Sequence, residues 1–225
     1  MRNKALVLVA GGSGKRMGSK LPKQFLELKG KPILMHSMKA FYQAFSALEI
    51  VLVLPESQQE FWKELCKKHQ FDIPHQVVNG GAERFHSVHN GLMALKTEGL
   101  VAIHDGVRPL LSSALVEKAF QDLRKNTGRI PVVPVIDSLR DVSDHTSQSV
   151  NRSNFKAVQT PQVFHLEEIK AAFEQGYRES FTDEASVFEK HGGEIELFEG
   201  ESENIKITRK LDLKLAELIL EEREN

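Results

Sequence analysis

Cysteine is almost absent from this 225-residue chain, and neither sign of charge is in excess. The single cysteine, Cys66, excludes an internal disulfide framework and is typical of a reducing compartment, so we expect a cytoplasmic protein. Lys and Arg number 30 against 31 Asp and Glu, and the formal net charge of -1 gives no overall attraction to nucleic acid or an anionic membrane. Any phosphate-binding site must therefore be local.

Long apolar runs are absent as well. The apolar stretch near the start ends at Gly11, which is too short for a secretory signal or a membrane-spanning helix, so we expect no membrane partner. The length suits one α/β domain, residues 1–225, with its own hydrophobic core.

Short β-branched runs alternate with helical patterns in the first half of the chain. Buried strands are expected at residues 5–10, 50–54, 76–78 and 100–104, and another near 130–135. Helices are expected after Pro32 and from Phe85, where apolar residues recur at helical spacing. This order predicts an α/β fold with a mostly parallel sheet and with ligands at the carboxyl ends of the strands.

A polar, serine-rich stretch then leaves the alternating pattern at about residues 137–157. Its spaced aliphatic residues favour a hairpin arm that pairs elsewhere, for instance with a second subunit, although a disordered loop would also explain them. Beyond it we expect helices near 166–177 and 183–190, a strand at 194–199, and an amphipathic closing helix that carries Leu211, Leu215, Leu218 and Ile219.

A glycine-rich segment, residues 10–23, follows the first expected strand directly. Its glycines allow backbone N–H groups to approach a phosphate closely. The segment also carries four cations, Lys15, Arg16, Lys20 and Lys23. The combination predicts a nucleoside triphosphate site, and the alternative is a flexible surface turn with solvated lysines.

Two familiar phosphate motifs do not fit this segment. The Walker A pattern requires a glycine in place of Val9 and Ser or Thr in place of Arg16. The dinucleotide fingerprint requires a glycine in place of Met17. What remains suits nucleotidyl transfer, in which fixed positive charge stabilises the transition state and the leaving pyrophosphate. Arg16 and Lys23 are the candidate catalytic cations, and losing one such group typically costs about 2 to 4 kcal/mol.

Two further segments fall at expected strand ends. Asp105 ends an apolar strand and could bind Mg²⁺ together with phosphate oxygens, or simply cap the following loop. Residues 80–87 form a glycine turn into a helix that could meet a base or phosphate, although Glu83 there also suits the helix dipole. His86 and His89 have no third ligand at a matching spacing, so zinc is not expected.

Several blocks together resemble the 2-C-methyl-D-erythritol 4-phosphate cytidylyltransferases of the non-mevalonate isoprenoid pathway. The resemblance covers essentially the whole chain. It is carried by residues 10–17, 22–25, 80–84, 87–88, 104–109, 160–162, 182–186 and 204–208. It implies a Rossmann-like three-layer α/β sandwich of the nucleotide-diphospho-sugar transferase type, with an extended β-arm. Ala82 departs from the family, which often has an acid there.

The resemblance also implies site residues and partners. CTP would bind along Ala10, Gly11, Gly12, Gly14, Gly81, Ser87 and Lys206. Arg16 and Lys23 would stabilise the pentacoordinate α-phosphorus, and the reaction would use Mg²⁺ and release pyrophosphate. The methylerythritol phosphate would be surrounded by Asp105, Arg108, Arg152, Thr160 and Thr182. Arg152 would come from the neighbouring subunit's arm, which implies a homodimer.

Two rival functions share these motifs. A ribitol 5-phosphate cytidylyltransferase has the same glycine loop, and only residues 182–186 together with Arg152 favour the methylerythritol enzymes. A catalytically silent nucleotide-binding homologue would keep the fold, but the presence of both Arg16 and Lys23 argues against it.

Overall fold

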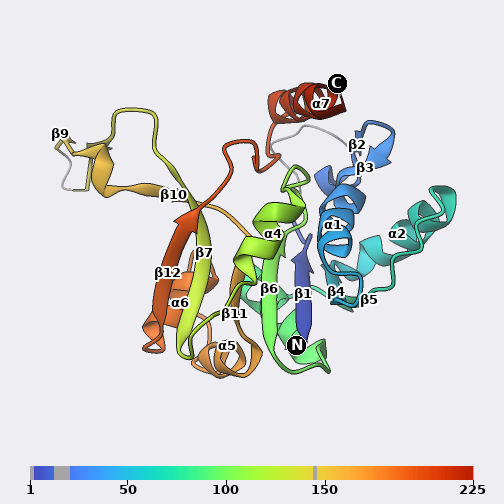
Figure 1. The fold of residues 1–225 in the computed structure, drawn as a ribbon, viewed down its shortest axis with the longest axis horizontal. Coiled ribbons are helices and arrows are strands. Elements are labelled where there is room, and N and C mark those ends of the chain that lie inside the picture. The colour runs from blue at the N-terminus through green and yellow to red at the C-terminus, as the bar shows by residue number, and fades with distance from the viewer. Residues whose placement is uncertain (1–2, 13–20, 144–145, 225) are drawn as a thin grey trace.

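The computed structural model describes residues 3–12, 21–143 and 146–224. Within these residues, eight strands form one central sheet in the order β10-β7-β11-β6-β1-β4-β5, with β12 paired to β7 (Figure 1). The strands are β1 (Lys4–Val9), β4 (Glu49–Leu54), β5 (Gln76–Asn79), β6 (Leu100–Asp105), β7 (Thr127–Pro134), β10 (Lys156–Val158), β11 (Gln162–His165) and β12 (Glu194–Glu199). The four strands from the first half of the chain, β1, β4, β5 and β6, pair in parallel, as the sequence predicts.

The second half of the chain adds strands of both directions. Strand β11 lies between β6 and β7 and runs antiparallel to both, and β10 is antiparallel to β7. Strand β12 runs parallel to β7. Neither β10 nor β11 is predicted from the sequence, because strands of 3 and 4 residues are too short to show a period.

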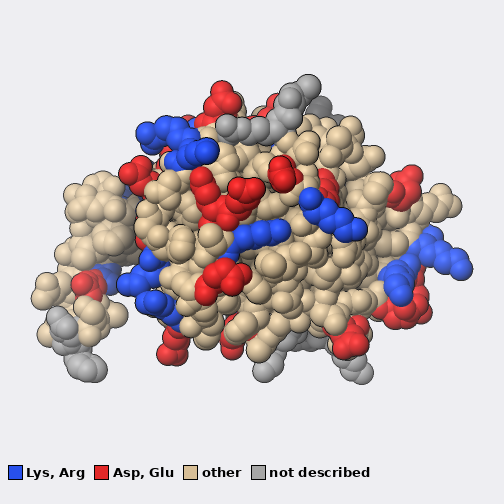
Figure 2. Space-filling model, turned by 90° about the horizontal axis from the view of Figure 1, so that it is seen from below, with Lys and Arg blue, Asp and Glu red and all other residues tan. Residues whose placement is uncertain are grey.

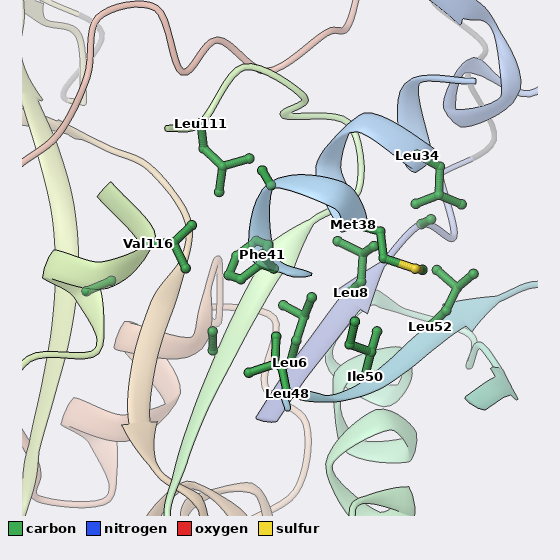
Figure 3. Packing of buried hydrophobic residues seen from close by; sticks show 14 of the residues in the cluster. Leu6, Leu8, Leu34, Met38, Phe41, Leu48, Ile50, Leu52, Leu111 and Val116 are labelled. Atoms are coloured by element: carbon green, nitrogen blue, oxygen red, sulfur yellow. The ribbon is translucent and has the colours of Figure 1, made fainter. Parts of the chain in front are cut away.

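Helices cover both faces of the sheet (Figure 1). They are α1 (Ile33–Ala44), α2 (Glu56–Lys68), α3 (Arg84–Ala94), α4 (Ser113–Ala119), α5 (Leu166–Phe173), α6 (Glu184–Lys190) and α7 (Lys210–Glu224). Alternate residues of β1 point to opposite faces. Leu6 and Leu8 belong to the core with Phe41 of α1 (Figure 3), whereas Ala5 and Val7 belong to the core formed with α3, α5 and α6. The three-layer α/β sandwich confirms the predicted fold class.

Helix α3 packs closely against β1 and β4 because residue 91 is glycine. A Cβ atom at Gly91 would lie 2.5 Å from Cγ1 of Val7 and 2.9 Å from Cγ2 of Val53. Such distances are shorter than van der Waals contact, so any side chain here would push the helix away from the sheet. This close packing fixes the start of α3 near the ends of the central strands.

A small hairpin precedes α1 and is not predicted from the sequence. Its strands are β2 (Glu27–Leu28) and β3 (Lys31–Pro32), and it follows the 3-10 helix η2 (Lys23–Phe25). The two loop residues, Lys29 and Gly30, have φ values of 50 and 73, which is the backbone of a tight hairpin turn. Two-residue strands leave no periodic signal in the sequence.

Helix α7 is the expected closing helix, but it buries a different face. Ala216 is fully buried, and Leu213 and Ile219 are partly buried in a small cluster with the β2–β3 hairpin. Leu211, Leu215 and Leu218, which define the apolar face in the sequence, are exposed. Among the helices of the described residues, none is long and apolar enough to cross a membrane.

The polar stretch after β7 extends away from the sandwich (Figure 1). It contains a short antiparallel hairpin of β8 (Arg140–Asp141) and β9 (Gln148–Ser149), followed by the 3-10 helix η3 (Arg152–Asn154). Val142 and Phe155 are exposed on it. The described residues therefore form an arm, and what the arm packs against stays a prediction.

Candidate active site

The sheet ends in a cavity at the carboxyl ends of β1, β5 and β6. The cavity has a volume of about 230 Å³. Its lining residues are Val9, Ala10, Gly11, Gly12, Lys23, Gln24, Gly81, Ala82, Glu83, Arg84, Ser87, Asp105, Val107 and Lys206. Residues from six of the blocks that carry the resemblance, including 204–208 in the loop before α7, thus meet at the edge where a parallel sheet places its ligands.

The opposite end of the sheet looks different. Figure 2 views the molecule from that side, and Lys and Arg are interspersed there with Asp and Glu. The mixed charges match the net charge of -1, and the described residues on this face form no continuous basic surface for nucleic acid.

The backbone after β1 forms one wall of the cavity. The N–H of Ala10 donates to the carbonyl of Val53 at 3.0 Å, and the buried Gln24 side chain donates to the carbonyl of Ala10 at 2.7 Å. Lys23 lies beside this wall, since a Cβ atom at Gly12 would stand 3.4 Å from its Cε. Glycine backbone and a lysine ammonium are therefore brought together, as a phosphate site needs. Gly14 and Arg16 lie outside the described residues.

The turn between β5 and α3 forms the second wall. The N–H of Gly81 donates to the hydroxyl of Ser87 at 3.0 Å, which folds the turn over the first residues of the helix. A Cβ atom at Gly81 would collide with Cβ of His86, so this turn requires glycine. Glu83 is the N-cap residue of α3 in a capping box with His86. Glu83 therefore stabilises the start of α3 as its N-cap residue and does not lie in the first turn of the helix.

Asp105 at the end of β6 is surrounded by three cations. Its Oδ1 lies 3.4 Å from Nη2 of Arg84, and its Oδ2 lies 2.8 Å from Nζ of Lys206 and 3.7 Å from Nε of Arg108. Burial by itself raises the pKa of the Asp105 carboxyl, but Arg84 and Lys206 outweigh it and hold the pKa below its usual value. The Asp105 side chain is therefore ionised near neutral pH, and the side chains that form ion pairs with it among the described residues are all cations.

This environment is a poor fit for a metal ion. Within the described residues, no group of three or more His, Cys, Asp or Glu side chains could hold one. A divalent cation at Asp105 would also have to lie beside Arg84, Lys206 and Arg108 and would be repelled by them. The predicted role of Asp105 as a Mg²⁺ ligand is untested, and its surroundings argue against it.

The Thr160 hydroxyl is hydrogen-bonded both to the backbone of Asp105 and to the buried His104. The N–H of Asp105 donates to Oγ1 of Thr160 at 3.2 Å, and Oγ1 lies 2.9 Å from Nδ1 of His104. The other ring nitrogen, Nε2, lies 3.2 Å from the carbonyl oxygen of Arg108, which can only accept. Nε2 therefore carries the proton, and Nδ1 accepts from the Thr160 hydroxyl. Burial lowers the pKa of His104 to about 4, so the ring is neutral.

The remaining predicted acceptor residues take different positions. Arg108 donates from Nη1 to the carbonyl of Asn204 at 2.7 Å and approaches Asp105, so it flanks the cavity. Thr182 lies on the loop before α6, next to Arg84 in a small adjoining pocket. Arg152 lies on the arm, outside the cavity lining, where its guanidinium contacts the carbonyl of Ile136. The chain alone therefore does not bring Arg152 to the other residues.

Two residues to which the sequence assigns no role also belong to this site. Arg84 lines the cavity, and its guanidinium pairs with Glu184, which is only 1% exposed. Burial raises the pKa of Glu184, and Arg84 opposes that rise. Both residues lie in motif blocks, but they are 100 positions apart, and a pair so distant leaves no spacing pattern in one sequence.

The fold and the cavity by themselves define a class of protein. A three-layer α/β sandwich with glycine backbone and several cations at its strand ends belongs to the proteins that bind phosphorylated small molecules. A family model for 2-C-methyl-D-erythritol 4-phosphate cytidylyltransferase matches residues 4–222. The chain belongs to this family.

Individual relatives agree with the family. A 2-C-methyl-D-erythritol 4-phosphate cytidylyltransferase of Bacteroides thetaiotaomicron is 48% identical over 216 residues, which cover 96% of this chain and 99% of that protein. The enzyme of the same name from Shouchella clausii is 36% identical over 225 residues, covering 98% of each.

Solved structures show the same fold. A 4-diphosphocytidyl-2C-methyl-D-erythritol synthase from Anaerococcus prevotii matches with a TM-score of 0.84 at 29% identity, over 98% of this chain and 96% of that one. The cytidylyltransferase of Thermus thermophilus matches with a TM-score of 0.78 at 28% identity, over 98% of this chain and 100% of the other.

Proposed function

We propose that this protein transfers CMP from CTP to 2-C-methyl-D-erythritol 4-phosphate, giving 4-diphosphocytidyl-2-C-methyl-D-erythritol and pyrophosphate. The observation that carries the proposal is the family match over residues 4–222, together with a cavity in which that family's motif blocks meet.

The reaction needs positioned charge more than a reactive side chain. An oxygen of the acceptor's phosphate forms a bond to the α-phosphorus of CTP, and the bond from that phosphorus to the oxygen bridging to the β-phosphate breaks. The acceptor phosphate is already largely ionised near neutral pH, since such groups have a second pKa of about 6. No general base is required. The enzyme contributes alignment and stabilises the charge of the leaving pyrophosphate.

The nucleotide side of the proposal uses the first two walls. Backbone groups of Ala10, Gly11 and Gly12 hold the triphosphate, and Lys23 neutralises charge that develops on it. Gly81 and Ser87 face the cytidine. Gly14 and Arg16 complete this set as proposals from the sequence.

The acceptor side uses the cluster around Asp105. The carboxylate can accept hydrogen bonds from hydroxyl groups of the polyol, while Lys206 and Arg108 attract its phosphate. Thr160 and Thr182 complete the chain's own part of this side. Arg152 is proposed to arrive from the arm of a second copy.

Magnesium is proposed to enter with the nucleotide. Its preference for phosphate oxygens and water suits the triphosphate, where it would neutralise charge. The cations around Asp105 do not fit a protein-held ion, so none of the steps above depends on one.

The test is pyrophosphate release with CTP and Mg²⁺ across a panel of polyol phosphates. We expect turnover with 2-C-methyl-D-erythritol 4-phosphate and much slower turnover with ribitol 5-phosphate. Preferential turnover of ribitol 5-phosphate would overturn the acceptor assignment. Replacement of CTP by ATP, GTP or UTP should abolish the signal.

The arm supports a homodimer. Val142 and Phe155 expose apolar surface on a segment that extends from the body, and Arg152 beside them lies away from the cavity of its own chain. We expect a dimer in sedimentation or light-scattering measurements, and Val142→Asp together with Phe155→Asp should shift it toward monomer. A wild-type protein that is monomeric at assay concentration would contradict the proposed homodimer.

The single cysteine, Cys66, supports a cytoplasmic location.

A further inference from the structure

We propose that Glu184 is a positioning residue for this transfer reaction, which holds Arg84 so that the Asp105 carboxylate keeps its place in the cavity. The inference rests on the proposed function.

The contact geometry is that of a two-point clamp. Nη1 of Arg84 contacts Oε1 of Glu184, and Nη2 donates to Oε2 at 3.0 Å. Nη2 also donates to Oδ1 of Asp105 at 3.4 Å. Two nitrogens of one guanidinium thus bind the Glu184 carboxylate, and the second of them is shared with Asp105. A planar fork of this kind fixes direction as well as distance.

The clamp joins three separate parts of the fold. Arg84 is the first residue of α3, Glu184 is the first residue of α6, and Asp105 is the last residue of β6. The turn before α3 forms the nucleotide wall, and the loop before α6 carries Thr182 on the acceptor side. Arg84 contacts Asp105 directly, so a shift of Arg84 would reach the acceptor side first.

Burial separates the roles of the two acids. The side chain of Glu184 is 1% exposed and does not line the cavity, whereas the Asp105 side chain is 10% exposed and does. Arg84 is 32% exposed and also lines the cavity. Glu184 borders only the small adjoining pocket that Thr182 and Arg84 also line, and both of its carboxylate oxygens contact Arg84, so we infer that it acts through Arg84.

Charge explains why the second acid is needed. Without Glu184, the remaining acidic partner of Arg84 among the described residues would be Asp105. Arg84 would then compete with Lys206 and Arg108 for contact with the Asp105 carboxylate. A buried ion pair is weak support for stability by itself, because desolvation offsets much of the attraction. The contribution of this ion pair is that Glu184 binds the Arg84 guanidinium, which leaves the Asp105 carboxylate available to the acceptor.

The rival explanation is a strut that merely joins α3 to α6. Such a strut would affect folding stability and both substrates alike. A positioning role predicts instead that the effect of changing Glu184 depends on Arg84 and falls mainly on the acceptor.

The experiment is a double-mutant cycle in the pyrophosphate-release assay with CTP and 2-C-methyl-D-erythritol 4-phosphate. Glu184→Gln should lower kcat/KM for the acceptor by roughly ten- to a hundredfold, with the KM for CTP changed by less than about threefold. Arg84→Gln should have a similar effect, and the double variant should be no worse than Arg84→Gln alone.

A matched control removes a similar pair elsewhere. Glu196 pairs with Arg129 between β12 and β7, outside the cavity lining, so Glu196→Gln should leave acceptor kinetics unchanged at a comparable melting temperature. If Glu184→Gln fails to fold, Arg84→Lys serves instead, because it keeps the charge but loses the fork, and it should show the same acceptor-specific loss.

Three outcomes overturn the inference. Folded Glu184→Gln with acceptor kcat/KM within about twofold of wild type would do so, as would additive effects in the double variant or equal losses for CTP and acceptor. A wild-type protein that releases no pyrophosphate refutes the proposed function and this role with it. An active wild type with an unaffected Glu184→Gln variant refutes the positioning role alone.

Discussion

Acid should destabilise this protein through the buried side chain of His104. The His104 ring is completely buried, gives its Nε2 proton to the carbonyl of Arg108 and accepts from Thr160 at Nδ1. Protonation would place a second N–H against the Thr160 hydroxyl, close to the charges of Arg108 and Lys206. The native state therefore resists it.

The loss of stability follows from the pKa values of His104 in the unfolded and the folded state. The pKa of His104 falls from 6.5 to about 4 on folding, chiefly because of burial. One pKa unit corresponds to about 1.4 kcal/mol, so the full effect is about 3 kcal/mol. Because the folded-state value is the lower one, the unfolded state binds more protons between pH 6.5 and 4, and stability falls as the pH falls through that range. About 2 kcal/mol of it should be lost between pH 7 and pH 5.

The assay is urea unfolding at pH 7 and pH 5, on wild type and on His104→Gln. The variant is less stable at pH 7, but its loss between the two pH values should be about 2 kcal/mol smaller than that of wild type. His36 and His75, whose pKa values are also lowered by burial, contribute equally to both proteins and cancel. Equal losses in the two proteins would refute the reasoning. So would a His104 imidazole signal that titrates near 6.5 in NMR of the folded wild type, and this measurement needs no variant.

Two other predictions concern the catalytic loop and the packing beneath it. Lys23→Ala should lower turnover in the pyrophosphate assay by about 30- to 1,000-fold, the equivalent of about 2 to 4 kcal/mol of transition-state stabilisation. Rates equal to wild type would mean that the basic loop is not catalytic. Gly91→Ala gains about 1 kcal/mol in helix propensity, but overpacking against Val7 and Val53 costs about 1 to 3 kcal/mol, so we expect a net loss in urea unfolding. Adding Val7→Ala should recover much of it, and a Gly91→Ala protein more stable than wild type would contradict this close packing of α3 on the sheet.

The sequence predicts those parts of the fold that carry their own period. Strands β1, β4, β5 and β6 are found within a residue of their expected positions, because each contains a short run of apolar residues that ends close to a glycine or proline. Strand β5 lies at the edge of the sheet and is only partly buried, not buried as expected. Strand β7 begins at Thr127, earlier than expected, since Gly128 and Arg129 lack an apolar pattern. Strands β10 and β11 and the β2–β3 hairpin escape prediction because their pairing depends on distant chain segments or on a special turn.

The same division applies to the site. The glycine wall is local in sequence, so its glycines and the cations among them are enough to predict a phosphate-binding role for its backbone. The cluster around Asp105 joins Arg84, Arg108 and Lys206 from three separate segments, and only the fold reveals that all three surround one carboxylate. That arrangement surrounds Asp105 with three cations and argues against a metal-binding role, which stays a prediction.

The two sides of the cavity therefore differ in how they are held. On the side proposed to bind the nucleotide, backbone groups form the wall, and the buried Gln24 fixes the carbonyl of Ala10, so the shape depends little on ionisable groups. On the side proposed to bind the acceptor, charged side chains from different segments restrain one another through Asp105 and Glu184. Because the net strength of such a network depends on all its members, single substitutions there should act non-additively, whereas substitutions in the glycine wall should act through local shape.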